Sequence, residues 1–273
     1  MSTTELISRQ CPLCGIDNSG ESSLMLSETY RLKRCRVCRF VYLECVPDYA
    51  RLQDDYQWRA DWKAEESRRA DEQPVVQNMS RTLRRAVKSR RRKKLDVLME
   101  KYRPDHPANL LDIGCGTGRK GMKFADWYTP YGIEIEPPSA AEADRKFRSL
   151  GGYVTCLPAL EGLDEFRDVR FDAVLMNAYL EHEMHPTPVL EKLRSLCTPE
   201  CKLFIKVPNY ASLNRRVRGR KWCGFHIPSH VNYFTPETLQ RMIEATGYRV
   251  VQFGLFDRFP TNDSMWMIAG VSG

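Results

Sequence analysis

The chain has 273 residues, of which 42% are apolar and 28% charged, and its formal net charge is +7. This balance excludes an intrinsically disordered chain, and no window approaches the roughly 18 apolar residues that a membrane-spanning helix needs. Residues 1–10 lack the basic and apolar regions of an export signal, so we expect a cytoplasmic protein with no membrane partner. Its ten cysteines are then expected to be thiols or metal ligands rather than disulfides.

Two C-x-x-C pairs mark residues 1–47 as a separate small module. Cys11 and Cys14 form the first pair, and Cys35 and Cys38 form the second. Each pair places two thiolates on one tight turn, and the four together can complete a tetrahedron around Zn²⁺ with no open position. Four unligated thiols are the alternative, but so short a module has too little apolar bulk to fold without a staple. The spacing therefore predicts a zinc ribbon whose metal is structural.

Residues 48–107 are rich in charge and are predicted to form a helical linker or cap. A single run holds many of its cations: Arg81, Arg84, Arg85, Lys88, Arg90, Arg91, Arg92, Lys93 and Lys94. Such a run could contact the phosphates of a nucleic acid or an acidic substrate. We favour a solvated helix face, because the apolar residues of 95–99 are spaced as one buried stripe and the rest of the chain is nearly charge-balanced.

From residue 108 to 273, apolar runs of strand length alternate with helical patterns, which is typical of an α/β domain with a mostly parallel sheet. Helices are expected after the first strand as far as Trp127, from a cap at Ser139, from a cap at Thr187 and from a cap at Thr235. The last two strands are predicted to pair antiparallel at the sheet edge. The expected strands are residues 109–113, 131–134, 154–156, 171–176, 202–207, 248–256 and 265–271.

A glycine-rich turn follows the first of these strands. Asp112 is followed by Gly114, Gly116 and Gly118 and then by the expected helix, so a ligand can approach the backbone closely. A dinucleotide-binding turn of the G-x-G-x-x-G type would need a glycine where this chain has Arg119. Glu134, at the end of the next strand, is placed to bind two ribose hydroxyls.

The run Leu-Leu-Asp-Ile-Gly-Cys-Gly-Thr-Gly at residues 110–118 resembles motif I of the class I S-adenosylmethionine methyltransferases. The resemblance extends to residues 171–174 and 177–182 and to residues 206–209, and so covers nearly everything beyond residue 90. Residues 1–47 are similar to the zinc ribbon that a subset of these enzymes carries, followed by a tyrosine-rich helix at residues 47–56. The resemblance implies a seven-stranded Rossmann-like sheet with helices on both faces, preceded by the ribbon and the helical linker.

The family resemblance also implies which residues bind the cofactor. Asp112, Gly114 and Gly116 would contact its amino-acid end, and Glu134 would contact the ribose. Cys156 and Leu157 would contact the adenine. The same match places four further residues at the cofactor: Cys115, Gly118, Ile135 and Asn177. Asn177 departs from the acid often found after the fourth strand of the family.

Methyl transfer is an in-line displacement, so the main requirements are alignment of the acceptor and exclusion of water. A general base is needed only where the acceptor must lose a proton, and histidine is the natural candidate. We predict catalytic roles for His182, which follows the fourth strand, for His230 and for Tyr179. For each histidine the alternative is a structural hydrogen-bonding role.

Three functions are consistent with these residues. The leading hypothesis is methyl transfer to the oxygen, nitrogen or carbon of a small molecule or sugar. A cluster of cations before Trp222 could clamp a phosphate or carboxylate on that acceptor: Arg215, Arg216, Arg218, Arg220 and Lys221. The second is an rRNA or tRNA methyltransferase that holds RNA with the ribbon and the basic run. The third is a cofactor-binding scaffold without catalysis.

Overall fold

A computed structural model describes residues 6–23, 25–26, 30–47 and 94–272 of the chain. Of the predicted linker, residues 94–107 are described and contain helix α4 (Lys94–Lys101), and the first strand of the main sheet begins at residue 108; the predicted domain boundaries stay a prediction. The predicted tyrosine-rich helix and all of the basic run except Lys94 lie outside the described residues. Lys94 itself forms an ion pair with Asp257, 2.5 Å away. No helix in the described ranges is long and apolar enough to cross a membrane.

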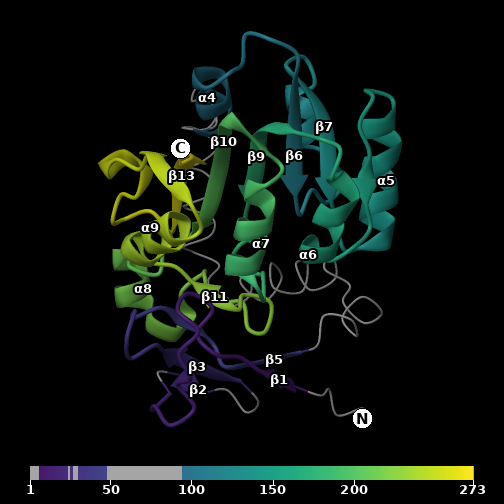
Figure 1. Ribbon diagram of the computed structural model, residues 1–273. Helices are drawn as coiled ribbons and strands as arrows, with labels where there is room; N and C mark the ends of the chain where they lie inside the picture. Colours follow the sequence, from purple (N-terminus) through teal and green to yellow (C-terminus); the bar gives the residue numbers. More distant parts are fainter. Residues whose placement is uncertain (1–5, 24, 27–29, 48–93, 273) are drawn as a thin grey trace, which may run out of the picture.

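The main sheet has seven strands, as predicted, and its fold is Rossmann-like (Figure 1). All neighbouring strands pair in parallel except β13, which runs antiparallel to both of its neighbours. The predicted antiparallel pair of the last two strands is therefore confirmed, with β12 at the edge. In order across the sheet the strands are β12 (Tyr248–Gln252), β13 (Ser264–Val271), β10 (Cys197–Pro208), β9 (Phe171–Asn177), β6 (Ala108–Ile113), β7 (Tyr128–Ile133) and β8 (Val154–Thr155).

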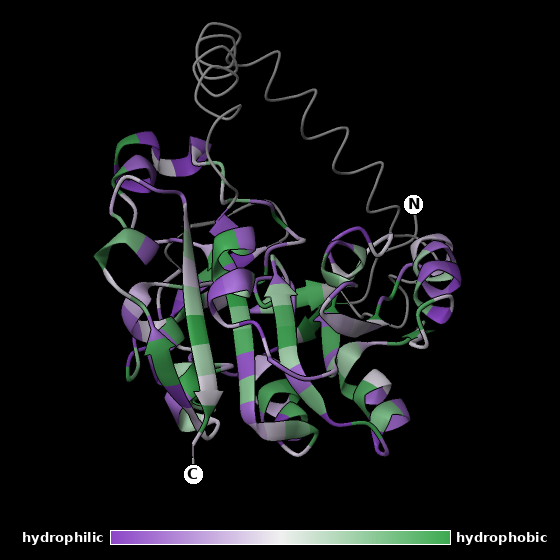
Figure 2. Cartoon of the chain, turned by 90° about the horizontal axis from the view of Figure 1, so that it is seen from above, coloured by the Kyte–Doolittle hydropathy of each residue, from purple (hydrophilic) through white to green (hydrophobic). Residues whose placement is uncertain are grey.

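Helices cover both faces of the sheet, because alternate side chains of each buried strand point to opposite sides. In β6, Leu111 and Ile113 join the core beneath α6 (Ala159–Gly162), α7 (Pro186–Arg194) and α9 (Pro236–Ala245). Leu110 instead packs with α4 on the second face. There α5 (Pro137–Arg148) also packs, through Phe147, against β7. Figure 2 shows the apolar strands at the centre and the more polar helix surfaces outside them.

Two small sheets form the N-terminal module. One pairs β1 (Leu6–Ser8) with β5 (Cys45–Pro47), and the other has the order β11-β4-β3-β2. Its strands are β2 (Met25–Leu26), β3 (Arg31–Arg34), β4 (Val41–Leu43) and β11 (Asn232–Tyr233). Strand β11 comes from the other end of the chain, so the main domain completes the sheet of the module. The module lies at the carboxyl edge of the main sheet, where β6 and β9 end (Figure 1).

Three local expectations were wrong. A single 3-10 turn, Gly121–Phe124, replaces the helix expected after the glycine turn, and Gly121 packs against Phe147 of α5, where an added Cβ would lie 2.6 Å from the ring. Helix α5 begins at Pro137 rather than after Ser139, whose hydroxyl instead bonds to the carboxylate of Glu136. Helix α7 begins at Pro186, one residue before Thr187.

Thr187 is free to make a different contact because it does not cap α7. Its hydroxyl donates a hydrogen bond to the carbonyl of Pro12, 2.7 Å away in the N-terminal module. The cap expected at Thr235 is confirmed, and it forms a reciprocal capping box with Thr238 at the start of α9.

Candidate functional site

The three glycines of the turn after β6 have different surroundings. All three have positive φ angles, of 69° at Gly114, 54° at Gly116 and 75° at Gly118, which other residues adopt at a cost. A Cβ at Gly118 would lie 2.9 Å from Phe147, so this glycine is required by packing against α5. A Cβ at Gly116 would meet nothing within 4 Å. Gly116 is therefore the point at which a ligand can approach the backbone.

The turn is anchored on the end of β7. The backbone N–H groups of Gly114 and Cys115 both donate to the carbonyl of Ile133, at 2.8 and 3.1 Å. Glu134 follows directly, and its two carboxylate oxygens accept hydrogen bonds from the N–H groups of Gly116 at 2.7 Å and Glu136 at 2.9 Å. Burial raises the pKa of Glu134. The acid predicted to bind the ribose thus lies against the open glycine.

Asp112 is a buried carboxyl with an unsatisfied oxygen. Its residue is 1% exposed, and its Oδ2 has no hydrogen-bond partner among the described residues. Burial raises the pKa of Asp112 to about 7, while the positive charge of Lys120 and a hydrogen bond from the Gly121 backbone act in the opposite direction. A buried acceptor of this kind is costly unless a donor reaches it. The site therefore fits a ligand that carries a cationic or N–H group.

The residues predicted to contact adenine lie on the far side of Glu134. The thiol of Cys156 is 3.8 Å from the carbonyl of Ile135, and burial together with the charge of Glu134 raises the pKa of Cys156. Leu157 and Ile135 are half-buried, and Cys156 is exposed. These three residues follow β7 and β8 at their carboxyl ends, beside the glycine turn, and their contact with a cofactor stays a prediction.

The end of β9 brings the predicted catalytic residues to the same edge. Asn177 is its last residue, and Ala178 follows with a φ of 59° and an N–H that donates to the carbonyl of Lys206. Tyr179 lies against Gly114, where an added Cβ would be 3.1 Å from its ring. The Tyr179 hydroxyl hydrogen-bonds to the carboxylate of Glu183.

His182 and His230 lie together, with ring centroids 4.6 Å apart and planes at 84°. The Nδ1 atom of His182 is 2.8 Å from the Ser229 carbonyl, and that of His230 is 2.9 Å from the Gly224 carbonyl. Because a carbonyl only accepts, each Nδ1 must carry the proton, and the lone pair of each neutral ring is on Nε2. Burial lowers the pKa of His182 to about 4, so the ring is neutral at physiological pH.

Glu181 lies beside the two predicted catalytic histidines but is not among the residues predicted from the sequence. It is 1% exposed, its Oε2 has no hydrogen-bond partner among the described residues, and burial raises its pKa to about 8 against the charges of Lys206 and Lys120. It contributes an oxygen within 4.8 Å of nitrogens of His182 and His230. Its position directly before His182 was the signal that could have identified it.

The cations predicted to clamp the acceptor lie in and after α8 (Leu213–Arg218), with different surroundings. Arg215 is used locally, because its Nε donates to the Tyr210 carbonyl at 2.9 Å and its guanidinium lies 4.3 Å from the Tyr210 ring centre. Arg216 and Arg218 are exposed or half-exposed on the helix surface. A hollow of about 460 Å³ opens beside this helix, lined in part by Asn214 and Trp266 but by none of the predicted site residues.

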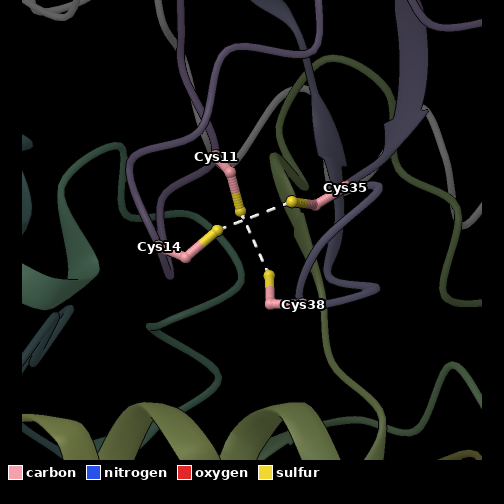
Figure 3. Close-up of side chains that lie close together, drawn as sticks. All are labelled: Cys11, Cys14, Cys35 and Cys38. Atoms are coloured by element: carbon pink, nitrogen blue, oxygen red, sulfur yellow. Dashed lines mark hydrogen bonds between the residues drawn. The ribbon is translucent and has the colours of Figure 1, made fainter.

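The four cysteines of the N-terminal module converge as predicted (Figure 3). The sulfur atoms of Cys11 and Cys38 are 3.4 Å apart, those of Cys14 and Cys35 are 3.5 Å apart, and all four lie within 4.8 Å of one another. Zinc bound by four thiolates at about 2.3 Å would place the sulfurs roughly 3.8 Å apart. The cluster therefore fits a structural zinc site.

The two cysteine turns are built alike. Gly15 has a φ of 71° and donates to the carbonyl of Cys11 at 2.8 Å, and Arg39 has a φ of 65° and donates to the carbonyl of Cys35 at 3.0 Å. In each turn the residue after the second cysteine reverses the chain, so both thiols point inward. The placement of the two thiols in each turn is thus encoded locally by the C-x-x-C pair.

Comparison with known proteins identifies the domain that these residues belong to. A family profile described as a methyltransferase domain matches residues 79–253. A search of curated protein sequences gave no match.

Solved structures with the same fold are numerous but distant in sequence. A SAM dependent methyltransferase from Archaeoglobus fulgidus is 20% identical, with a TM-score of 0.51 over 68% of this chain and 94% of that one. Magnesium protoporphyrin IX methyltransferase from Synechocystis PCC 6803, solved with bound SAH, is 15% identical, with a TM-score of 0.52 over 82% and 100%. The [4+2]-cyclase SpnF is 18% identical, with a TM-score of 0.51 over 65% and 80%. At these identities the likeness establishes the fold.

Proposed function

Because the chain belongs to the methyltransferase domain family, we propose that it transfers a methyl group from S-adenosylmethionine to a small-molecule or sugar acceptor. One observation carries the proposal: the open backbone at Gly116 donates to the half-buried carboxylate of Glu134 and lies four residues after the buried carboxyl of Asp112. A nucleoside that bears both a ribose diol and an ammonium group matches this arrangement.

Each carboxyl suits one part of that cofactor. The unsatisfied Oδ2 of Asp112 would accept a hydrogen bond from the cofactor's ammonium group, which relieves the cost of its burial. The two oxygens of Glu134, already turned toward backbone donors at the glycine turn, would accept from the two ribose hydroxyls. Residues Ile135, Cys156 and Leu157 would line the adenine. When bound, the cofactor supplies an electrophilic methyl group on its sulfonium.

The chain's own chemical contribution is to orient the acceptor and receive its proton. His182 is neutral and its lone pair is on Nε2, so it can accept a proton from an acceptor hydroxyl, amine or acidic carbon. His230, 4.6 Å away, and Tyr179, which lies against Gly114, would fix the orientation of the acceptor. Strand β11 and the N-terminal module cover this edge of the sheet and would exclude water.

Two observations support a small acceptor. His230 is part of the segment of residues 222–234 and His182 lies against it, with ring centroids 4.6 Å apart, and Trp222 and Tyr233 of this segment are buried. In addition, structurally similar enzymes are named for small molecules, among them magnesium protoporphyrin IX and 1,6-didemethyltoxoflavin. The [4+2]-cyclase has the same fold, and one fold can host different reactions, so the test of the proposed function measures methyl transfer itself.

We also propose that the four cysteines hold one zinc ion with a structural role. The test is metal analysis of the purified protein, with one zinc per chain expected. Exposed Cys14 is the ligand to replace, and Cys14→Ser should lower the zinc content, whereas replacement of Cys197, which lies outside the cluster, should not.

The proposed activity is tested by incubating the protein with methyl-labelled S-adenosylmethionine and separate small-molecule and RNA fractions of a cell extract. Label in the small-molecule fraction is expected. His182→Ala should abolish most of that transfer, and His185→Ala is the matched control because His185 is exposed at the start of α7. Label in the RNA fraction alone would contradict the proposed acceptor class, and equal rates in both variants would contradict the role of His182.

A further inference from the structure

A buried hydrogen-bonded pair, Arg9 and Asn232, connects the N-terminal module to the segments that carry the two catalytic histidine candidates. Arg9 is 8% exposed and Asn232 is 1% exposed, and they are 223 residues apart in the sequence. Arg9 lies two residues before Cys11, and Asn232 lies two residues after His230. Neither residue was selected from the sequence, because nothing local to either one indicates the other.

The side chain of Asn232 bonds to the turn on both sides of Glu181 and His182. Its side-chain amide donates to the carbonyl of Leu180 at 2.8 Å and to the carbonyl of Glu183 at 2.6 Å. The backbone N–H groups of Val231 and Asn232 both donate to the carbonyl of Glu181, at 2.8 and 3.1 Å. The segment that also carries His230 therefore holds the turn after β9 through the carbonyls of Leu180, Glu181 and Glu183.

Arg9 holds this assembly from the side of the module. One guanidinium nitrogen donates both to the Asn232 side-chain oxygen at 3.0 Å and to the Met184 carbonyl at 2.7 Å, and the other lies 3.4 Å from the Val231 carbonyl. The Arg9 backbone is itself held by an N–H bond to the Glu44 carbonyl at 2.7 Å. The guanidinium of Arg9 thus connects the module to both segments, the one that carries His182 and the one that carries His230.

Backbone pairing between β4 and β11 forms a second connection between the module and the segment that carries His230. Asn232 and Tyr233 pair with Tyr42 and Val41 in the β11–β4 ladder, and the Leu43 N–H donates to the Val231 carbonyl at 2.9 Å. Strand β4 directly follows the second cysteine pair, so its position depends on the turn that Cys35 and Cys38 form. This ladder therefore connects the second cysteine turn to β11.

We infer that Arg9 and Asn232 are positioning residues for methyl transfer, through which the metal-binding module sets the placement of His182 and His230. The inference rests on the proposed function for its catalytic consequence, but the placement itself can be measured without activity. A shift of about 1 Å in a catalytic group can lower the rate by about 100-fold. A small displacement of the turn that carries His182 would therefore lower the rate of methyl transfer measurably.

The decisive variant is Asn232→Asp, which keeps size and the oxygen facing Arg9 but replaces the two N–H donors with a carboxylate oxygen that faces two carbonyls. The turn after β9 should move, and kcat should fall by about 100-fold. The dissociation constant for S-adenosylmethionine should stay within about twofold, because the glycine turn and Glu134 are untouched. The metal content should stay at the wild-type value.

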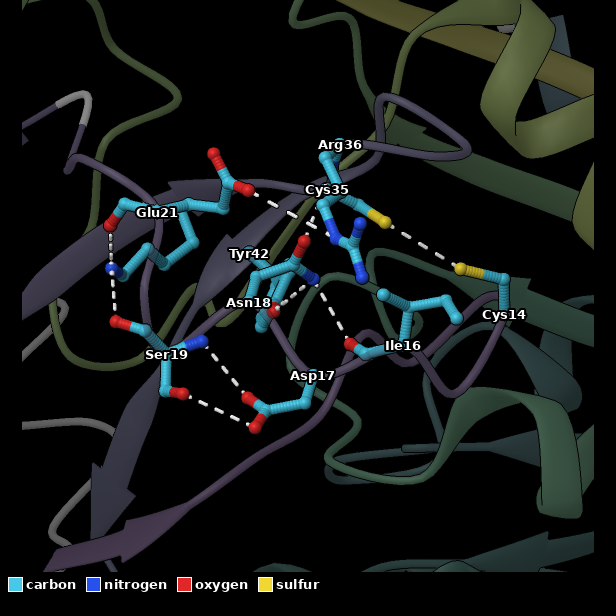
Figure 4. Close-up of polar contacts among 10 residues, drawn as sticks. Cys14, Ile16, Asp17, Asn18, Ser19, Glu21, Cys35, Arg36 and Tyr42 are labelled. Carbon is cyan, nitrogen blue, oxygen red and sulfur yellow. Dashed lines mark hydrogen bonds and ion pairs between the residues drawn. The ribbon is translucent and has the colours of Figure 1, made fainter.

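Asn18→Asp is the matched control. Asn18 is also buried, at 2% exposed, and its amide donates to the Ile16 carbonyl and the Tyr42 hydroxyl, while its oxygen accepts from the Arg36 N–H (Figure 4). These bonds lie wholly inside the module. Asn18→Asp leaves the Arg9–Asn232 bonds in place and should therefore lower kcat far less than Asn232→Asp does.

Two further readouts separate positioning from a general loss of stability. The imidazole NMR resonances of His182 and His230, and the acid limb of the rate profile against pH, should shift further in Asn232→Asp than in Asn18→Asp. Arg9→Lys, which keeps a charged donor, should retain more activity than Arg9→Met. Removal of the metal by a chelator should reproduce the shift of the histidine resonances while S-adenosylmethionine still binds.

The outcomes distinguish this inference from the proposed function. If the wild-type protein transfers no methyl group, the proposed function fails, and the histidine resonances still report whether the module sets their environment. If those resonances are the same in Asn232→Asp, Arg9→Met and the wild type, or if Asn18→Asp lowers kcat as much as Asn232→Asp, the inference is overturned. Should Asn232→Asp fail to fold, the comparison of Arg9→Lys with Arg9→Met carries the test alone.

Discussion

Replacing Asp112 with asparagine should change how the stability of the cofactor-free protein depends on pH. Burial raises the pKa of Asp112 from 3.8 to about 7, so the folded state holds this proton more tightly than the unfolded state does. Between about pH 4 and pH 7 the unfolded carboxyl is ionised and the folded one is not. The contribution of Asp112 to the free energy of unfolding is therefore full below about pH 4 and is lost as the pH rises toward 7.

The expected magnitude follows from the size of the shift. Each pH unit inside that window lowers the free energy of unfolding by about 1.4 kcal/mol, so the wild type should lose about 3 kcal/mol between pH 5 and pH 7 through Asp112. Asp112→Asn cannot ionise. Its amide keeps an oxygen for the Gly121 N–H and places an NH₂ group where Oδ2 has no partner, at a cost of about 1–3 kcal/mol that does not vary with pH.

Urea unfolding of both proteins, followed by circular dichroism from about pH 5 to pH 8, provides the measurement. The free energy of unfolding of Asp112→Asn minus that of the wild type should rise by about 3 kcal/mol between pH 5 and pH 7 and then level off. The variant should also bind S-adenosylmethionine more weakly, because it loses the charge opposite the ammonium group. Parallel stability curves for the two proteins would refute the reasoning, since Asp112 would then titrate alike in the folded and unfolded states.

Three further predictions concern the same edge of the sheet. Glu134→Gln should weaken S-adenosylmethionine binding by about 1.5–3 kcal/mol, or roughly tenfold to a hundredfold, by calorimetry; unchanged affinity would exclude Glu134 from the ribose contact. Gly118→Ala should lower the free energy of unfolding by about 1–3 kcal/mol, because its Cβ would clash with Phe147. Gly116→Ala should lower the free energy of unfolding by only about 1 kcal/mol but weaken cofactor binding at least about tenfold. A larger loss of stability in Gly116→Ala, or a larger loss of cofactor affinity in Gly118→Ala, would contradict the roles assigned to these glycines. Since a base acts only when neutral and burial lowers the pKa of His182 to about 4, kcat/KM for the acceptor at saturating S-adenosylmethionine should stay level as the pH falls to about 5 and drop below that; a drop centred near pH 6.5 would count against His182.

Features that are encoded within a few residues could be predicted from the sequence. The glycine turn, Glu134 at the end of the next strand and both cysteine turns depend on short spacings, and the structure contains all of them. The cap at Thr235 is another local signal and is confirmed. Strand positions were predicted to within a few residues because each buried strand is a continuous apolar run.

Features that depend on partners far away in the chain could not be predicted. The helix expected after the glycine turn is a single 3-10 turn, and its Gly121 packs against Phe147 of α5, a contact between residues 26 positions apart. Strand β11 is too short to be recognised, and it forms only because β4 offers an edge. The Arg9–Asn232 pair likewise forms only in the folded chain, where burial strengthens its hydrogen bonds.

The most direct test of the account is calorimetric titration of S-adenosylmethionine into the wild-type protein and into Gly116→Ala. We predict one binding site per chain in the wild type, with clearly weaker binding in Gly116→Ala at nearly unchanged stability. No binding of S-adenosylmethionine to the wild type, or equal binding to both proteins, would contradict the claim that the open glycine beside Glu134 is the cofactor site.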